Sequence, residues 1–119
     1  MTTLLLVDDN ENYRREMGEY FQNQGYHVQR VADLRAALIE VQYLQPGDLV
    51  VTDKNLGEHR GIIPLLNYLQ SEKPDVKVII ASGEVSLYAT KELYHHGFYQ
   101  KGGKSITDLV RMIEQLPPP

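Results

Sequence analysis

Two adjacent carboxylates follow an apolar run close to the start of the chain. The run Leu4–Val7 is typical of a buried strand, and Asp8 and Asp9 come directly after it. A third acid, Asp53, follows another apolar run in the same way. Taking a carboxylate out of water is costly unless a cation or hydrogen bonds replace its lost hydration. Acids at the ends of two apolar runs therefore indicate a site that binds a metal ion or shifts carboxyl pKa values.

The chain alternates short β-type runs with longer stretches of helical periodicity. Apolar runs rich in valine and isoleucine predict central strands covered on both faces, whereas the alternation in 27–31 is typical of an edge strand. Strict strand–helix alternation predicts an α/β fold: a doubly wound, five-stranded parallel sheet in the flavodoxin-like order 2-1-3-4-5, with five helices in three layers. The predicted strands are 3–7, 27–31, 48–52, 76–81 and 97–101, and the predicted helices are 11–24, 33–45, 61–72, 85–95 and 105–116.

Residues near the helix ends support these helices. Asp33 and Ser105 are expected to cap the helices that follow them, and Gly25 is expected to end the first helix. Pro64 lies in the first turn of its helix, where a missing backbone N–H costs little. In the first helix, Tyr13 belongs to an apolar stripe at helical spacing. Capping residues and apolar periodicity thus predict the same helices.

The predicted fold brings the three acids to one edge of the sheet. Ligands of doubly wound sheets bind outside the carboxyl ends of the strands, where the strand order reverses. The first and third strands are neighbours there, so Asp8, Asp9 and Asp53 are expected to share one crevice. Three close carboxylates require a cation or raised pKa values, and oxygen ligands without cysteine favour Mg²⁺. A simpler alternative is that Asp8 or Asp9 only caps the next helix.

Length, composition and charge restrict the class of protein. The 119 residues fit one domain over 1–116, followed by a proline tail or the start of a linker at 117–119. A net charge of −4 with scattered basic residues argues against direct binding to nucleic acid. No cysteine is present for a disulfide or thiolate metal site, and the apolar runs are too short to span a membrane. We therefore expect a cytoplasmic protein.

The residues at the predicted strand ends resemble those of the receiver domains of two-component response regulators, over nearly the whole chain. That family has an acid pair, an aspartate after strand three, a hydroxyl residue after strand four and a lysine after strand five. TDKNLGEHRG (52–61) resembles its third-strand motif, and IIASGE (79–84) has Ser82 at the hydroxyl position. FYQKGGKS (98–105) supplies an aromatic residue and a lysine. Each motif alone is weak, but together they are specific.

The resemblance implies a phosphorylation site with a metal beside it. Asp53 would take a phosphoryl group from a histidine kinase or a phosphotransfer protein in a Mg²⁺-dependent reaction. The metal ligands would be the carboxylates of the three acids and one backbone carbonyl: Asp8, Asp9, Asp53 and Asn55. The domain would catalyse its own phosphorylation and dephosphorylation but would act primarily as a signalling switch.

Two further groups are implied to contact the phosphoryl oxygens. Ser82 would donate a hydrogen bond, and a lysine would form an ion pair. Lys101 ends the predicted fifth strand, whereas counting forward from Ser82 without gaps reaches Lys104. We choose Lys101 because the residues QKGG would make a poor strand. Ser82 and Phe98 would form the switch, with the serine moving inward and opening space for the aromatic ring.

The resemblance also implies a partner surface. The fourth helix, the fifth strand and the fifth helix form the face that the family commonly uses for homodimers or downstream partners. Four residues lie on or beside it: Tyr88, Lys91, Tyr94 and Tyr99. An alternative function is a receiver-like interaction module that acts without being phosphorylated. The segment KGGKS (101–105) invites comparison with a nucleotide-binding loop but lacks the first glycine at the required spacing.

Overall fold

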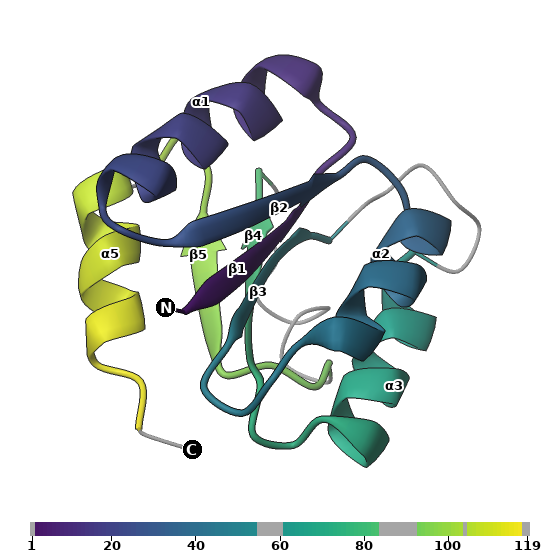
Figure 1. Ribbon diagram of the computed structural model, residues 1–119. Coiled ribbons are helices and arrows are strands. Elements are labelled where there is room, and N and C mark those ends of the chain that lie inside the picture. Colours follow the sequence, from purple (N-terminus) through teal and green to yellow (C-terminus); the bar gives the residue numbers. More distant parts are fainter. Residues whose placement is uncertain (1, 55–60, 84–92, 104, 118–119) are drawn as a thin grey trace.

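The computed structural model has the predicted α/β fold (Figure 1). It describes residues 2–54, 61–83, 93–103 and 105–117. Five parallel strands form one sheet in the order β2-β1-β3-β4-β5, so the predicted strand order is confirmed. The strands are β1 (Thr3–Val7), β2 (His27–Val31), β3 (Leu49–Asp53), β4 (Lys77–Ser82) and β5 (Gly97–Gln100). The described helices are α1 (Glu11–Asn23), α2 (Leu34–Glu40), α3 (Ile63–Glu72) and α5 (Ile106–Glu114), with a 3₁₀ turn η1 (Val41–Tyr43).

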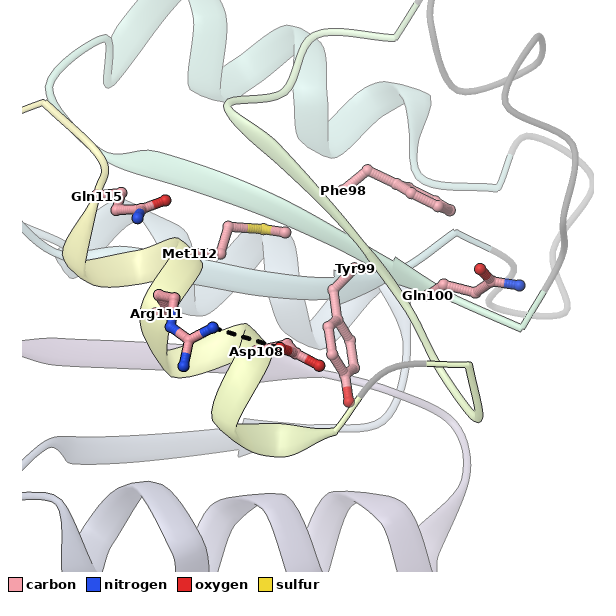
Figure 2. Close-up of a pocket in the computed structure, with 7 residues that line it drawn as sticks. All are labelled: Phe98, Tyr99, Gln100, Asp108, Arg111, Met112 and Gln115. Atoms are coloured by element: carbon pink, nitrogen blue, oxygen red, sulfur yellow. Dashed lines mark ion pairs between the residues drawn. The ribbon is translucent and has the colours of Figure 1, made fainter.

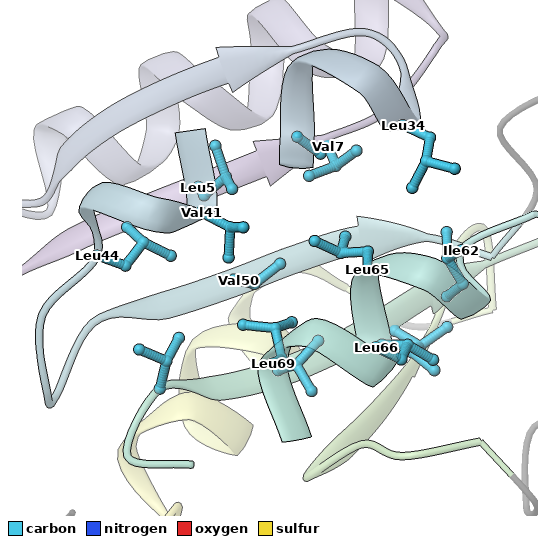
Figure 3. Close-up of a cluster of buried hydrophobic side chains, with 14 residues drawn as sticks. Leu5, Val7, Leu34, Val41, Leu44, Val50, Ile62, Leu65, Leu66 and Leu69 are labelled. Carbon is cyan, nitrogen blue, oxygen red and sulfur yellow. The ribbon is translucent and has the colours of Figure 1, made fainter. Parts of the chain in front are cut away.

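Helices cover both faces of the sheet, which accounts for the uninterrupted apolar run at the start of the chain. Leu4 and Leu6 of β1 lie in the hydrophobic cluster beneath α1 and α5. Leu5 and Val7 lie in the cluster beneath α2 and α3, which Figure 3 shows. All four side chains are at most 1% exposed, so no position on this strand favours a polar residue. No described helix has both the length and the apolar character to span a bilayer.

Polar side chains and glycine define the helix ends. Asp33 Oδ1 accepts a hydrogen bond of 2.8 Å from a backbone N–H in the first turn of α2, which confirms its capping role. Ser105 and Asp108 form a reciprocal capping box at the start of α5, so the second predicted cap is also confirmed. Gly25 follows α1 with φ of 99°, a conformation that favours glycine. These caps satisfy backbone groups that the helices leave unpaired.

The four described helices are all shorter than predicted: α1 (predicted 11–24) by one residue, α5 (predicted 105–116) by three, and α2 and α3 at identifiable breaks. The helix predicted over 61–72 begins at Ile63 because Gly61 has φ of 59°, outside the right-handed helical region. The helix predicted over 33–45 ends at Glu40, and the chain then tightens into η1 before becoming extended at Leu44. Pro46 follows two residues later and cannot continue a helix.

The strand ends also differ slightly from the prediction. β3 and β4 each begin and end one residue later than predicted, so Asp53 and Ser82 are the last residues of their strands. β5 ends at Gln100, one residue earlier than predicted. The predicted fourth helix, 85–95, lies mostly outside the described residues. Its final part, 93–95, is described and is not helical, because the chain there approaches β4 to form the fifth strand.

His96 joins β4 and β5 through both its backbone and its ring. Its backbone N–H donates to the Val78 carbonyl oxygen at 2.8 Å, and its ring Nδ1 accepts a hydrogen bond from the Val78 N–H at 3.0 Å. The ring packs edge-to-face against Tyr94. Burial lowers the pKa of His96 below its ordinary value, with smaller contributions from Lys77 and His95. The fold therefore favours the neutral ring with Nδ1 unprotonated.

We expect the free energy of unfolding to fall as His96 becomes protonated. The folded-state pKa lies below the unfolded value of 6.5, so the unfolded chain binds the proton more readily. The stabilising contribution of His96 is therefore complete above that value and is lost as the pH falls through the folded-state pKa. Urea unfolding between about pH 8 and about pH 5 measures the effect.

The matched variants are His96→Asn and His27→Asn. Asparagine keeps an oxygen that accepts the Val78 N–H but does not titrate, so His96→Asn should show a shallower pH dependence than the wild type. The His27 side chain is exposed, and its replacement should leave the wild-type pH dependence in place. An identical pH dependence of the wild type and His96→Asn would refute this role.

Candidate functional site

Three carboxylates converge at the carboxyl edge of the sheet. β1 and β3 are parallel neighbours with Val7 beside Thr52, so the residues that follow, Asp8 and Asp53, emerge next to each other. Asp9 joins them, and one carboxylate oxygen from each acid lies within 4.8 Å of the others. Asp8 is buried, Asp53 is half-buried and Asp9 is exposed. The structure thus brings the three predicted acids together.

Asp8 is held through its backbone and through both of its carboxylate oxygens. Its N–H donates to the Val31 carbonyl oxygen at 3.1 Å, and its own carbonyl oxygen accepts from Arg14 Nη1 at 2.7 Å. Carboxylate Oδ1 accepts from the Asn10 backbone N–H at 2.9 Å, and Oδ2 accepts from Lys101 Nζ at 2.5 Å. Asp8 is only 1% exposed, so these donors replace the water that burial removes.

Asn10, rather than either neighbouring acid, caps α1. Its side-chain oxygen accepts a hydrogen bond of 2.9 Å from the Tyr13 backbone N–H. The alternative in which Asp8 or Asp9 serves only as the helix cap is therefore wrong, because the capping position falls on the next residue. The carboxylates of both acids instead belong to the cluster at the sheet edge.

Lys101 supplies positive charge to the acid cluster. It directly follows β5, and its backbone N–H donates to the Ser82 carbonyl oxygen at 2.9 Å, which fixes it beside the end of β4. Its Nζ lies 2.5 Å from Asp8 Oδ2 and 3.5 Å from Asp53 Oδ2. On a third side, Nζ lies 4.3 Å from the centroid of the Tyr13 ring. The lysine chosen from the sequence therefore contacts two of the three acids.

Ser82 lies beside this group of charges. It is the last residue of β4 and is 1% exposed, and the residue before it pairs in register with Asp53. A Cβ atom added to Gly83 would meet no atom of the described residues within 4 Å, so none of them crowds the backbone next to the serine. The predicted metal ligand Asn55 and the alternative lysine, Lys104, lie outside the described residues.

The predicted switch and partner residues of β5 lie on opposite faces of the sheet. Figure 2 shows Phe98 and Tyr99 pointing to opposite sides of the strand. Phe98 is half-buried against the cluster beneath α2 and α3, as is Tyr94. Tyr99 is only 5% exposed and packs beneath α1 and α5, so it is a core residue. Tyr88 and Lys91 lie outside the described residues.

The acids have the chemistry of a divalent-cation site. Ligands at about 2.1 Å from one Mg²⁺ lie about 3.0 to about 4.2 Å apart, so oxygens within 4.8 Å of one another would draw closer together around a shared ion. All three donors are hard oxygen atoms, which suit Mg²⁺ better than a soft metal. Because Lys101 already contacts Asp8 Oδ2, an ion would share that carboxylate with the lysine or displace it. The exposed Asp9 gives the site a side that is open to solvent.

Two residues of α1 join the site without having been assigned to it from the sequence. The apolar pattern places Tyr13 on the buried stripe of the helix and gives Arg14 no role. In the structure, the Tyr13 ring contacts Lys101 and the Arg14 side chain binds the Asp8 carbonyl oxygen. Both lie in the first turns after the acids, and that closeness in sequence is the feature that could have indicated them.

A family model matches most of the chain. The model is described as the response regulator receiver domain, and it matches residues 4–114. The matched range includes the acid cluster, the serine that ends β4 and the lysine that follows β5. None of the curated proteins is a significant match to the chain.

Solved structures share the fold at low sequence identity. Chemotaxis protein CheY4 of Vibrio cholerae is 21% identical, with a TM-score of 0.83 over 98% of this chain and 99% of that chain. A response regulator protein from Burkholderia pseudomallei, solved with a phosphorylated aspartic acid, calcium ion and citrate, is 18% identical, with a TM-score of 0.82 over 97% and 68%. Response regulator protein TrrA of Thermotoga maritima, in complex with Mg(2+)-BeF, is 19% identical, with a TM-score of 0.76 over 95% and 99%.

We expect Lys101→Met to lower the free energy of unfolding by about 3 kcal/mol, because it leaves the buried Asp8 carboxylate without its cation. Urea unfolding in the presence of a chelator measures this loss. The double variant Asp8→Asn/Lys101→Met removes both charges and should regain part of the stability. If the effects of the two single variants simply add in the double variant, the two side chains are not coupled.

Proposed function

The chain belongs to the response regulator receiver domains, and on this basis we propose that it accepts a phosphoryl group on Asp53 in a Mg²⁺-dependent reaction that switches a partner interface. The observation that carries the proposal is the convergence of Asp53 with two further acids and the Lys101 ammonium. The donor is the phosphohistidine of a histidine kinase or a phosphotransfer protein, and the reaction takes place in the cytoplasm.

The reaction transfers a phosphoryl group from the donor to a carboxylate. A carboxylate oxygen of Asp53 forms a bond to phosphorus while the bond from phosphorus to the donor atom breaks. The donor leaves with that electron pair and takes up a proton. A carboxylate is a weak nucleophile, so the rate depends on charge neutralisation and on in-line placement. When bound, Mg²⁺ neutralises negative charge on the carboxylate and phosphoryl oxygens.

The metal ligands are the acids of the cluster. Asp9 and Asp53 would bind the ion directly, Asp8 would bind it directly or through a water molecule, and the backbone carbonyl of Asn55, which lies outside the described residues, would complete the protein ligands. The support for this assignment is that carboxylate oxygens of the three acids already lie within 4.8 Å of one another.

Two side chains act on the phosphoryl oxygens. Lys101 Nζ, which lies 3.5 Å from Asp53 Oδ2, pairs with one oxygen of the group that Asp53 acquires. Ser82, at the neighbouring strand end, donates a hydrogen bond to another. Ser82 ends β4 and Lys101 directly follows β5, so the two groups would approach the phosphoryl group from the ends of neighbouring strands.

The switch links Asp53 to the surface of β5 and α5. Ser82 moves toward the phosphoryl group and opens space for the Phe98 ring. On the other face of the sheet, a cavity of about 360 Å³ lies between β5 and α5, with Tyr99, Arg111 and Met112 in its lining (Figure 2). The Phe98 ring packs on the α2 and α3 side, so its movement would act on the β5 and α5 surface, through which a homodimer or a downstream partner binds, by way of the β5 backbone.

Phosphorylation is tested directly with a small-molecule phosphodonor and Mg²⁺. We expect intact mass to increase by one phosphoryl group and peptide mapping to place the modification on Asp53. Asp53→Asn should stay unmodified, whereas Asp75→Asn, an exposed acid before β4 at the other edge of the sheet, should react like the wild type. A wild-type protein that stays unmodified would instead favour a receiver-like interaction module that works without phosphorylation.

The proposed switch is tested by measuring how the phosphodonor affects dimerisation and backbone dynamics. The phosphodonor should change dimerisation or amide exchange around residues 82–101 in the wild type and in Asp75→Asn, but not in Asp53→Asn. If Asp53→Asn responds to the phosphodonor as strongly as the wild type does, the effect does not arise from this carboxylate.

Metal binding is tested with Asp9→Asn. Asp9 is exposed, so its replacement should leave the fold intact while lowering Mg²⁺ affinity by at least about tenfold. Calorimetric titration of Mg²⁺ into the wild type, Asp9→Asn and Asp75→Asn measures the difference. Equal affinities in all three proteins would place the ion elsewhere.

A further inference from the structure

We propose that Tyr13 is a positioning residue for phosphoryl transfer, and that the face of its ring holds the Lys101 ammonium between Asp8 and Asp53. This role rests on the proposed function. It adds to the site a residue that would not be found by looking for contacts with a carboxylate or a phosphoryl group. The reacting atoms belong to Asp53, and Tyr13 acts on them only through the lysine.

The surroundings of the Lys101 ammonium point to this role. The ammonium has three N–H donors. Two carboxylates stand within reach, with Asp8 Oδ2 at 2.5 Å and Asp53 Oδ2 at 3.5 Å. The centroid of the Tyr13 ring lies 4.3 Å away, well inside the range of a cation–π contact. The lysine side chain is only 19% exposed, so most of it is shielded from water.

The position of Tyr13 is fixed by the same carboxylate that holds the lysine. The Tyr13 backbone N–H binds the Asn10 side chain at 2.9 Å, and the Asn10 backbone N–H binds Asp8 Oδ1 at 2.9 Å. Asp8 Oδ2 in turn accepts from Lys101. The ring also packs against the hydrophobic cluster beneath α1 and α5. The Tyr13 ring is therefore held in a fixed position beside the flexible side chain of Lys101.

The ring of Tyr13, rather than its hydroxyl, makes this contribution. Among the described residues, the buried Tyr13 hydroxyl has no hydrogen-bond partner, which is unfavourable. Burial raises the pKa of this hydroxyl, and Tyr99, Asp8 and Asp53 raise it further. The phenol consequently stays neutral and keeps the electron-rich face that attracts a cation. Phenylalanine retains that face and lacks the unpaired hydroxyl.

The expected consequence is on the rate of transfer. A lysine side chain has several rotatable bonds and a strongly hydrated ammonium, so it gains freedom and water when one wall of its site is removed. Lys101 would then spend less time close to Asp53, where it must meet the incoming phosphoryl oxygen. Tyr13 thus contributes by keeping the lysine in place before the phosphoryl group arrives.

The test compares initial rates of phosphorylation by a small-molecule phosphodonor with Mg²⁺. Tyr13→Leu should lower the rate by about fivefold, the factor that corresponds to one cation–π contact of ordinary strength. Tyr13→Phe should restore it to within about twofold of the wild type. Tyr20→Leu is the matched control, because Tyr20 is a half-buried tyrosine of the same helix that packs on Phe21; it should react at the wild-type rate.

Dependence on the lysine separates positioning from a general structural effect. In a Lys101→Met background, Tyr13→Leu should cause no further loss of rate, since the cation that the ring holds is absent. Equal losses in Tyr13→Phe and Tyr13→Leu would overturn the proposal, as would a fivefold loss that persists without Lys101. A wild-type rate in Tyr13→Leu would overturn it as well.

Failure of the proposed function gives a different result. If the wild-type protein accepts no phosphoryl group, the proposed function fails, and urea unfolding then tests the contact between Tyr13 and Lys101. The unfolding constants of Tyr13→Leu, Lys101→Met and the double variant should show a coupling of about fivefold. Additive effects in that cycle would overturn the contact itself.

Discussion

Repulsion among three carboxylates at one edge of the sheet is the constraint to which the surrounding structure responds. Two unit charges 4 Å apart interact by about 4 kcal/mol at an effective dielectric constant of about 20, which is a large share of a typical domain's stability of about 5 to 15 kcal/mol. The most buried of the three acids, Asp8, has a donor on each oxygen: a backbone N–H on one and the Lys101 ammonium on the other. The exposed Asp9 is left to solvent or to an ion.

The parallel sheet is what makes this arrangement both close and stiff. Neighbouring strands in register deliver Asp8, Asp53 and Ser82 to the same edge, and backbone hydrogen bonds to Val31 and Ser82 anchor the loops that carry Asp8 and Lys101. The apolar clusters on both faces bury all but one residue of each central strand and limit the movement of these strands. The charged groups therefore sit on a rigid base while their open side faces water.

The sequence was sufficient to predict the sheet and the acid cluster, because apolar runs and the residues that end them are local features. The bounds of β1 and β2 and the caps at Asp33 and Ser105 agree with the prediction. Contacts between distant residues were harder to predict. Lys101 and Asp8 are 93 positions apart. The strand pattern predicts that the lysine lies at the carboxyl edge of the sheet, but it does not predict which acid the lysine contacts. The contact between the Tyr13 ring and Lys101 was missed because an aromatic residue on the apolar face of a helix is normally interpreted as part of the hydrophobic core.

The unequal burial of Asp8 and Asp9 determines how the site responds to its surroundings. The countercharge of Asp8 is a lysine of the same chain, so it is present whatever the medium contains. The exposed Asp9 has to take its countercharge from the medium, and the occupancy of that countercharge follows the ionic composition there. Two adjacent acids thus differ in where their countercharges come from, and the exposed one depends more strongly on the ions in solution.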